Sequence, residues 1–142
     1  MIEIRKVTPE DIPTIHAMGE NVDEFHTSDH APNFWPEAIL CECISKDDVY
    51  FLVAASNDEL VGFVIANLNR SLSKALIENI FVKPEFRGQG IGTSLAKRVI
   101  DTAKADNYQF ISVLTPPDDI PAIKTYEKAG FSKGGVFLWL DA

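Results

Sequence analysis

The sequence lacks any apolar run that approaches the length of a membrane-spanning helix. Such a helix needs about 20 consecutive apolar residues. The opening residues 1–5 alternate apolar and charged side chains, so they do not form the long apolar segment of a signal peptide. We therefore expect a cytoplasmic protein with no membrane partner.

Cysteine and histidine are also scarce. Cys41 and Cys43 are the only two cysteines; they are too close for a disulfide framework and lack the second pair that a zinc site needs. His26 and His30 are four residues apart and close to Asp23, a spacing that metal ligands use, but no supporting motif accompanies them. We expect no metal site, and we expect the cysteines to be small apolar residues of a short helix.

Basic side chains are outnumbered, because 13 lysines and arginines stand against 21 aspartates and glutamates and give a net charge of -8. Nucleic-acid binders usually carry a basic surface, so we expect no nucleic-acid partner. A negative cleft attracts cations and suits a small cationic substrate, although acidity alone also keeps a protein soluble. The 142 residues, 46% of them hydrophobic, suffice for a single domain that spans residues 1–142.

Hydrophobic periodicity predicts strands alternating with helices. The strand patterns cover residues 2–5, 50–55, 60–68, 75–82, 110–114 and 136–140. The helix patterns cover residues 11–25, 36–44, 91–103 and 120–129. A turn at Asn57, Asp58 and Glu59 joins the second and third strands in a hairpin. Residues 75–114 form a strand, a helix and a strand, which requires a parallel pair; we therefore predict an α/β fold with a mixed sheet and helices on both faces.

The most informative segment lies between the strand 75–82 and the helix 91–103. It reads Arg87-Gly88-Gln89-Gly90-Ile91-Gly92. The first amides of a helix are unpaired and carry the positive end of its dipole, and glycine lets a ligand approach the backbone. These features predict a cradle for phosphate or pyrophosphate. A tight turn without a ligand is the alternative, whereas the dinucleotide-binding and P-loop patterns require a different spacing or a Gly-Lys-Ser/Thr ending.

This segment resembles the R/Q-x-x-G-x-G/A signature of the GNAT family of N-acetyltransferases. A second block, residues 122–131, resembles the A-x-x-x-Y-x-K-x-G-F block of the same family, and the two blocks have the family's order and spacing. The resemblance covers nearly the whole chain and implies the GNAT fold. It also implies an enzyme that transfers acetyl from acetyl-CoA to a primary amine, without naming that amine.

The resemblance assigns residues to the acetyl-CoA site. The backbone of the strand would pair with the pantetheine arm, and the glycine loop would hold the pyrophosphate; these residues are Ile80, Phe81, Val82, Arg87, Gly88, Gln89, Gly90, Ile91, Gly92 and Thr93. Tyr126 would lie near the CoA sulfur. Asp119 stands where the family often has Asn, and an ionised carboxylate accepts hydrogen bonds but does not donate them.

The same resemblance suggests two catalytic residues. Glu78 is the candidate base that removes a proton from the amine, and Tyr126 is the candidate acid that protonates the departing thiolate. Strict alternation would place Glu78 with Ile80 on one face of the strand and Asn79 with Phe81 on the other. The alternatives are an ordinary outward-facing carboxylate and a core tyrosine whose hydroxyl is satisfied.

Phe25, Phe34 and Trp35 lie where the family builds its acceptor pocket, and plain core packing explains them equally well. The acidic chain mildly favours a small cationic amine, bound together with acetyl-CoA for direct attack. Family members are often homodimers, and no sequence pattern locates an interface. A non-catalytic CoA-binding sensor or interaction module is the main alternative, and a nucleotide-binding oxidoreductase is a weaker one.

Overall fold

The computed structural model describes residues 1–25 and 28–141. Its centre is a five-stranded sheet in the order β1-β2-β3-β4-β5. The strands are β1 (Ile2–Lys6), β2 (Val49–Ser56), β3 (Glu59–Asn69), β4 (Lys74–Val82) and β5 (Phe110–Val113). The helices are α1 (Ile12–Glu20), α2 (Glu37–Ser45), α3 (Ile91–Ala105) and α4 (Ile120–Ala129), with short 3-10 turns η1 (Pro9–Asp11), η2 (Asp23–Phe25), η3 (Arg70–Leu72) and η4 (Pro84–Phe86). The predicted α/β fold with a mixed sheet is confirmed.

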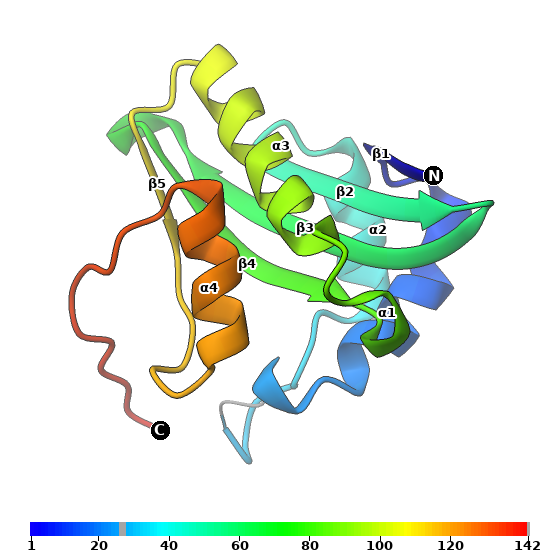
Figure 1. Ribbon diagram of the computed structural model, residues 1–142, viewed down its shortest axis with the longest axis horizontal. Helices are drawn as coiled ribbons and strands as arrows, with labels where there is room; N and C mark the ends of the chain where they lie inside the picture. The colour runs from blue at the N-terminus through cyan, green and yellow to red at the C-terminus, as the bar shows by residue number, and fades with distance from the viewer. Residues whose placement is uncertain (26–27, 142) are drawn as a thin grey trace.

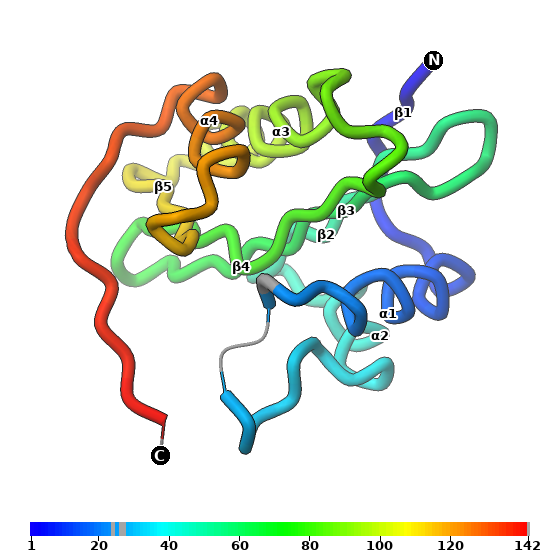
Figure 2. Tube along the Cα trace, turned by 60° about the horizontal axis from the view of Figure 1, so that its bottom comes forward, coloured from blue at the N-terminus to red at the C-terminus, as the bar shows by residue number. Residues whose placement is uncertain are grey.

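The sheet is sandwiched between two pairs of helices. Helices α3 and α4 lie on one face and α1 and α2 on the other, as the two views of Figures 1 and 2 show. One core cluster, which includes Phe34 and Phe63, fills the α1–α2 side, and a second, which includes Leu95 and Val99, fills the α3 side. No helix among the described residues has both the length and the apolar content to cross a membrane.

The hairpin between β2 and β3 follows the prediction closely. Its two-residue loop is Asn57-Asp58, and both residues have positive φ, 49° and 69°. Positive φ at both loop positions is the geometry of a type I′ turn, whose twist matches that of the flanking strands. The turn therefore fixes the register in which Ala55 faces Leu60.

Strand β4 makes unequal use of its two neighbours. It pairs with β3 along its length in an antiparallel ladder, but with β5 only from Lys74↔Phe110 to Ile77↔Val113, in parallel. Beyond Ile77 the edge of β4 that faces β5 has no strand partner among the described residues. The helix α3 makes the crossover between the two parallel strands, as the sequence predicted.

The predicted bounds of one helix and the existence of one predicted strand are wrong. The helix predicted over residues 11–25 ends at Glu20. The Val22 N–H donates to the Gly19 carbonyl, and the side-chain amide of Asn21 donates to the Ala17 carbonyl. Together these two bonds close a tight last turn. The strand predicted over residues 136–140 is also not formed. A strand requires a neighbouring ladder, and this segment pairs with no strand in the described chain.

Candidate functional site

The glycine loop leads directly into α3, whose N-cap residue is Gly90. Gly88 and Gly90 have φ of 80° and 79°, in the left-handed region that L side chains rarely adopt. A Cβ at either position would meet no atom within 4 Å, so backbone conformation rather than crowding requires glycine there. The first main-chain bond of α3 runs from Ser94 N–H to the Gly90 carbonyl, and the amides before it are available to an anion.

Gly92 has a different role, because it lies where α4 packs against α3. A Cβ on Gly92 would approach Thr125 Cγ2 to 3.2 Å. The Thr93 hydroxyl donates to the Thr125 carbonyl across 3.4 Å. The close approach of the two helices thus brings the turn that carries Tyr126 to the start of α3.

The Arg87 side chain does not turn back toward these amides. Its Nε donates to the Val82 carbonyl at 2.9 Å, and its guanidinium lies 5.7 Å from the centre of the Phe81 ring. The guanidinium therefore lies over the end of β4, on the side of the sheet that Phe81 occupies. Only the backbone of Arg87 belongs to the loop that could hold a pyrophosphate.

Glu78 occupies a β-bulge. Ile65 faces Asn79 and the next residue, Ala66, faces Ile77, so Glu78 is the extra residue on β4. Its exposed carboxylate accepts a hydrogen bond from Asn67 Nδ2 at 3.1 Å. Asn67 is paired with Val49, which packs in the α1–α2 core, so the prediction that Glu78 shares the face of Ile80 is wrong.

The bulge coincides with the end of the β4–β5 ladder. Bulges reaim side chains and interrupt pairing, and here the interruption falls one residue after Ile77, the last β4 residue that pairs with β5. Past it, Ile80 and Val82 pack on the α3 side while Phe81 packs on the α1–α2 side. The backbone of residues 78–82 is thus left open toward the gap between the two strands.

The predicted pocket residues are partly core residues. Phe34 is buried and packs against Phe25 and Phe63, with ring centres 5.8 Å and 5.5 Å away. Trp35 is half-buried, and its indole Nε1 donates to Asn79 Oδ1 at 2.7 Å. This bond ties the segment before α2 to the residue next to Glu78.

Tyr126 is 8% exposed and lies edge-on to Phe131. Its hydroxyl has no hydrogen-bond partner among the described residues, yet no fully buried side-chain oxygen lacks a partner. The hydroxyl oxygen is therefore not fully buried. Burial, and then the nearby Asp119 carboxylate, raise the pKa of Tyr126 above its ordinary value, which keeps the hydroxyl protonated at neutral pH.

Asp119 has a local structural role. It is the N-cap of α4, and its Oδ1 accepts from the Ala122 amide at 3.3 Å. A capping carboxylate satisfies one of the free amides of the helix and complements its dipole. This capping bond explains the residue without a ligand.

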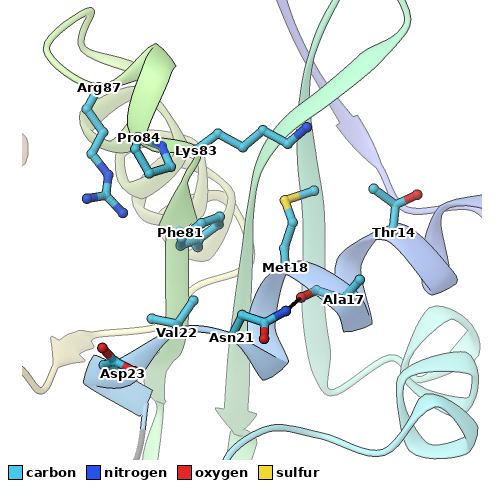
Figure 3. Close-up of a pocket in the computed structure, with 10 residues that line it drawn as sticks. All are labelled: Thr14, Ala17, Met18, Asn21, Val22, Asp23, Phe81, Lys83, Pro84 and Arg87. Carbon is cyan, nitrogen blue, oxygen red and sulfur yellow. Dashed lines mark hydrogen bonds between the residues drawn. The ribbon is translucent and has the colours of Figure 1, made fainter.

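An open groove of about 480 Å³ lies between the C-terminal end of α1 and the end of β4. Figure 3 shows its walls, with Met18, Asn21 and Asp23 on one side and Phe81 and Arg87 on the other. The Asp23 carboxylate has no cationic partner among the described residues. None of Glu78, Tyr126 or the three predicted pocket aromatics is among the described residues that line this groove.

Sequence reasoning missed Asn67 and Asn79, which hold Glu78 and Trp35. A signal was available in the spacing of the apolar residues of β4. Ala75 and Ile77 are two positions apart, and Ile80 and Val82 are two positions apart, but Ile77 and Ile80 are three positions apart. This shift of phase is what a bulge produces.

The predicted absence of a metal site involved His26, which lies outside the described residues. Over the described parts of the chain, 1–25 and 28–141, no group of three or more His, Cys, Asp or Glu side chains could hold a metal ion. His30 instead lies 3.3 Å from Asp141 Oδ1.

Comparison with known proteins gives consistent matches. The acetyltransferase (GNAT) family model matches residues 15–131. An uncharacterised N-acetyltransferase of Methanocaldococcus jannaschii is 34% identical over 68% of this chain, and a putative ribosomal-protein bS18-alanine N-acetyltransferase of Bacillus subtilis is 25% identical over 82% of it. The matches span 46% and 76% of those two proteins, so the chain covers less than half of the first.

The fold has solved counterparts. The PaiA N-acetyltransferase of Thermoplasma acidophilum, crystallised with coenzyme A, superposes with a TM-score of 0.79 at 22% identity, covering 93% of this chain and 90% of that one. At this level of identity the likeness concerns the fold alone.

Proposed function

Because the chain belongs to the GNAT acetyltransferase family, we propose that it transfers the acetyl group of acetyl-CoA to a primary amine. The observation that carries the proposal is the half-paired strand β4. Its ladder with β5 stops at Ile77↔Val113, and its free part runs into the loop of unpaired amides at the start of α3. An extended backbone edge next to an anion cradle suits a ligand with an amide-bearing arm and a pyrophosphate.

Residues of this site fit acetyl-CoA, which supplies the acetyl group. In the proposal, the edge of Ile80, Phe81 and Val82 binds the pantetheine arm. The backbone of the loop and the first turn of α3, residues 87–93, holds the pyrophosphate. Asp119 already caps α4, so we assign it at most a contact with a pantetheine amide.

Glu78 is the proposed base. An aliphatic amine has a pKa of about 10 and is protonated at neutral pH, so a proton must leave before the nitrogen can attack. The single hydrogen bond from neutral Asn67 orients the Glu78 carboxylate without neutralising it. The bulge turns the Glu78 carboxylate toward the α1–α2 side of the sheet. An amine acceptor can approach from that side without passing the acetyl-CoA proposed to bind along β4.

Tyr126 is the proposed acid. A buried phenol that keeps its proton at neutral pH can give it to the thiolate that leaves when acetyl is transferred. Its hydroxyl, which has no hydrogen-bond partner within residues 1–25 and 28–141, is available for that role. The two cysteines support direct attack in a ternary complex, because neither is suited to carry the acetyl group as a covalent intermediate. Cys43 is buried in the core with a raised thiol pKa, and Cys41 is on the outer side of α2.

The acceptor in this proposal is a small cationic amine. Glu78 and Asp23 are carboxylates without a cationic partner among the described residues, and both lie on the α1–α2 side of the sheet. The net charge of -8 adds a long-range attraction for cations. Phe25 and Trp35 would border the approach, with Phe34 supporting them from the core.

The test measures thiol release from acetyl-CoA over a panel of polyamines, aminoglycosides, amino acids and peptide N-termini. We expect turnover with at least one amine, and a loss of about 100-fold or more in kcat for Glu78→Gln with unchanged acetyl-CoA affinity. Glu3→Gln, an exposed carboxylate on the opposite edge strand, is the matched control. Tight CoA binding without turnover on any amine would instead identify a non-catalytic CoA-binding module.

A further inference from the structure

The groove between α1 and the end of β4 carries charges of both signs. Among the described side chains that line it, the charged ones are Asp23, Lys83 and Arg87. The Lys83 ammonium is already paired, because it lies 3.2 Å from Glu59 Oε2. Asp23 and Arg87 have no oppositely charged partner within residues 1–25 and 28–141. The groove therefore offers a ligand one anion and one cation that the described chain does not neutralise.

The Arg87 side chain is held in a position that suits a carboxylate. The bond from its Nε to the Val82 carbonyl and its contact with the Phe81 ring restrict the plane of the guanidinium. Its two terminal nitrogens have no carboxylate partner in the described chain, and such nitrogens can donate two parallel hydrogen bonds to one carboxylate. Figure 3 shows the guanidinium pointing from the loop toward the Phe81 ring, into the groove.

Asp23 belongs to the opposite wall of the groove (Figure 3). Opposite charges on two facing walls suit a ligand whose own two charges lie close together, as the ammonium and the carboxylate of an α-amino acid do. The rest of the lining includes Met18, Val22 and Phe81, which are apolar. Long charged molecules of the lysine type lay their methylene stems along such surfaces. The groove thus fits a zwitterionic head that carries a flexible apolar stem.

The groove leads along β4 toward the proposed base. Phe81 packs on the α1–α2 side of the sheet, where the Glu78 carboxylate also lies. Positions 78 and 81 are about 10 Å apart along an extended strand. The α-amine of an amino acid is only two bonds from its carboxylate carbon, so it cannot reach Glu78 while Arg87 holds the carboxylate. A distal amine on four methylene groups extends about 6 Å from the α-carbon, and hydrogen bonds of about 3 Å at each end cover the rest.

We propose that the acceptor is a free α-amino acid with a second, distal amine, and that the distal amine is acetylated. This inference rests on the proposed acetyl transfer and names its substrate class. Asp23 binds the α-ammonium, Arg87 binds the α-carboxylate, and the distal amine reaches Glu78. Such an amino acid carries a net charge of about +1 at neutral pH, which agrees with a cationic acceptor. A lysine within a protein chain lacks both charges of the head.

The step balances with the residues already assigned. Glu78 takes one proton from the distal ammonium and releases it to water, and the neutral nitrogen attacks the thioester carbonyl carbon. The C–S bond breaks and the CoA sulfur takes a proton from Tyr126, which regains the second proton that the nitrogen loses. The products are CoA and the amino acid acetylated at its distal nitrogen.

The first test compares free lysine with two analogues, by thiol release from acetyl-CoA. Cadaverine lacks the carboxylate, and aminocaproate lacks the α-ammonium. We expect kcat/KM for lysine to exceed that for each analogue by about tenfold or more, after correction for the two equivalent amines of cadaverine, because each analogue loses a charge-assisted contact. Fragment mass spectrometry of the lysine product should find the acetyl group on the distal nitrogen.

The second test assigns each charge to its residue. Arg87→Gln should bring the lysine-to-cadaverine ratio of kcat/KM close to one, and Asp23→Asn should do the same for the lysine-to-aminocaproate ratio. A ratio within one variant cancels any change in acetyl-CoA binding, and a merely structural role would lower both rates alike. Arg70→Gln, at an exposed arginine paired with Asp47 at the other end of β4, and Asp101→Asn, on the exposed side of α3, are the matched controls and should keep both ratios.

The outcomes separate this inference from the function on which it rests. Equal turnover of lysine and cadaverine by the wild-type chain, acetylation of the α-amine, or ratios that neither substitution changes would overturn the inference and leave acetyl transfer in place. Absence of turnover with every amine would overturn the proposed function, and this inference with it.

Discussion

Besides the outer side of β1, two edges of the described sheet lack a strand neighbour, and the surroundings of these two edges differ. The inner edge is residues 78–82 of β4, past the last pair with β5. The outer edge is the far side of β5 together with the segment 136–140. The inner edge is bordered by glycines, the free amides of α3 and the Glu78 carboxylate, whereas the outer edge is bordered by exposed Phe, Leu, Trp and Val side chains.

The residues that surround an unpaired strand edge, and not the edge itself, therefore determine what the edge can bind. Both edges offer the same backbone donors and acceptors. Polar groups and a helix N-terminus next to the inner edge can hold a small anionic ligand in a fixed position. The apolar side chains next to the outer edge are stabilised only when another apolar surface covers them and removes them from water.

The largest effect is expected from Tyr126→Phe at the inner edge. Removal of the proposed acid should lower kcat by about 100- to 1000-fold, the range typical of general acid catalysis, while the KM for acetyl-CoA changes little. The fold should tolerate the change, since the hydroxyl makes no hydrogen bond within the described residues. Steady-state kinetics with the best amine of the panel is the measurement.

Tyr108→Phe is the matched control, because Tyr108 is equally buried, at 8% exposure, but packs with Ala75 and Ala103 away from the loop. It should keep the wild-type kcat. Equal rates for wild type and Tyr126→Phe would remove the tyrosine from the mechanism and leave the inner edge as a binding site only.

A smaller effect is expected from Gly90→Ala. The methyl group meets no atom within 4 Å, so the cost comes only from the φ of 79°. That cost is about 1–2 kcal/mol for a residue with a Cβ, which corresponds to roughly a tenfold loss in CoA affinity if the loop shifts away from this conformation. Calorimetric titration with CoA measures it.

A substitution of Gly90 by asparagine distinguishes the cost of the backbone conformation from the cost of side-chain crowding. Gly90→Asn should lose less affinity than Gly90→Ala, because Asn tolerates the left-handed region better than other residues with a side chain. Gly134→Ala is a neutral control, since its Cβ also meets nothing and its φ is not in that region. Equal losses for Ala and Asn would mean that the side chain blocks the ligand directly.

The sequence predicted the inner edge better than the outer one, for a physical reason. The loop 87–92 and the hairpin turn at Asn57 depend on local backbone preferences, which a few residues encode. The strand predicted at 136–140 depends on a partner, and the pattern of a strand does not say where that partner lies. The bulge at Glu78 is intermediate between the locally encoded turns and the partner-dependent strand. The spacing of Ile77 and Ile80 indicates the bulge, but an assumption of strict alternation along the strand overlooks it.

The early end of α1 is another feature that local sequence patterns do not predict. The apolar spacing that continues to Phe25 is real, but Gly19 and Asn21 favour a stop and Phe34 packs against Gly19 from a distant part of the chain. A side chain on Gly19 would collide with that ring at 2.3 Å. Long-range contacts of this kind, like the Trp35–Asn79 bond, have no signature in local periodicity.

A substitution of Asp11 is expected to have the smallest effect on either edge, because this residue stabilises a part of the fold that is far from both edges. Its buried carboxylate accepts two hydrogen bonds from the Arg5 guanidinium, at 2.7 and 3.1 Å, and one from the Thr8 amide. These bonds hold the pKa of Asp11 below its usual value. The stability they contribute is therefore complete above the ordinary carboxyl pKa of about 4 and is lost as the pH falls toward the lower pKa of the folded state.

Asp11→Asn should lower the free energy of unfolding by about 2 kcal/mol at pH 7, and by less at pH 3, where protonation has already weakened the wild-type bonds. Urea denaturation at both pH values measures the difference. Glu20→Gln, which alters only an exposed i,i+4 contact with His16, should change stability by less than about 0.5 kcal/mol. If Asp11→Asn also changed kcat in conditions where the chain is folded, general stability rather than the surroundings of the two edges would explain their behaviour.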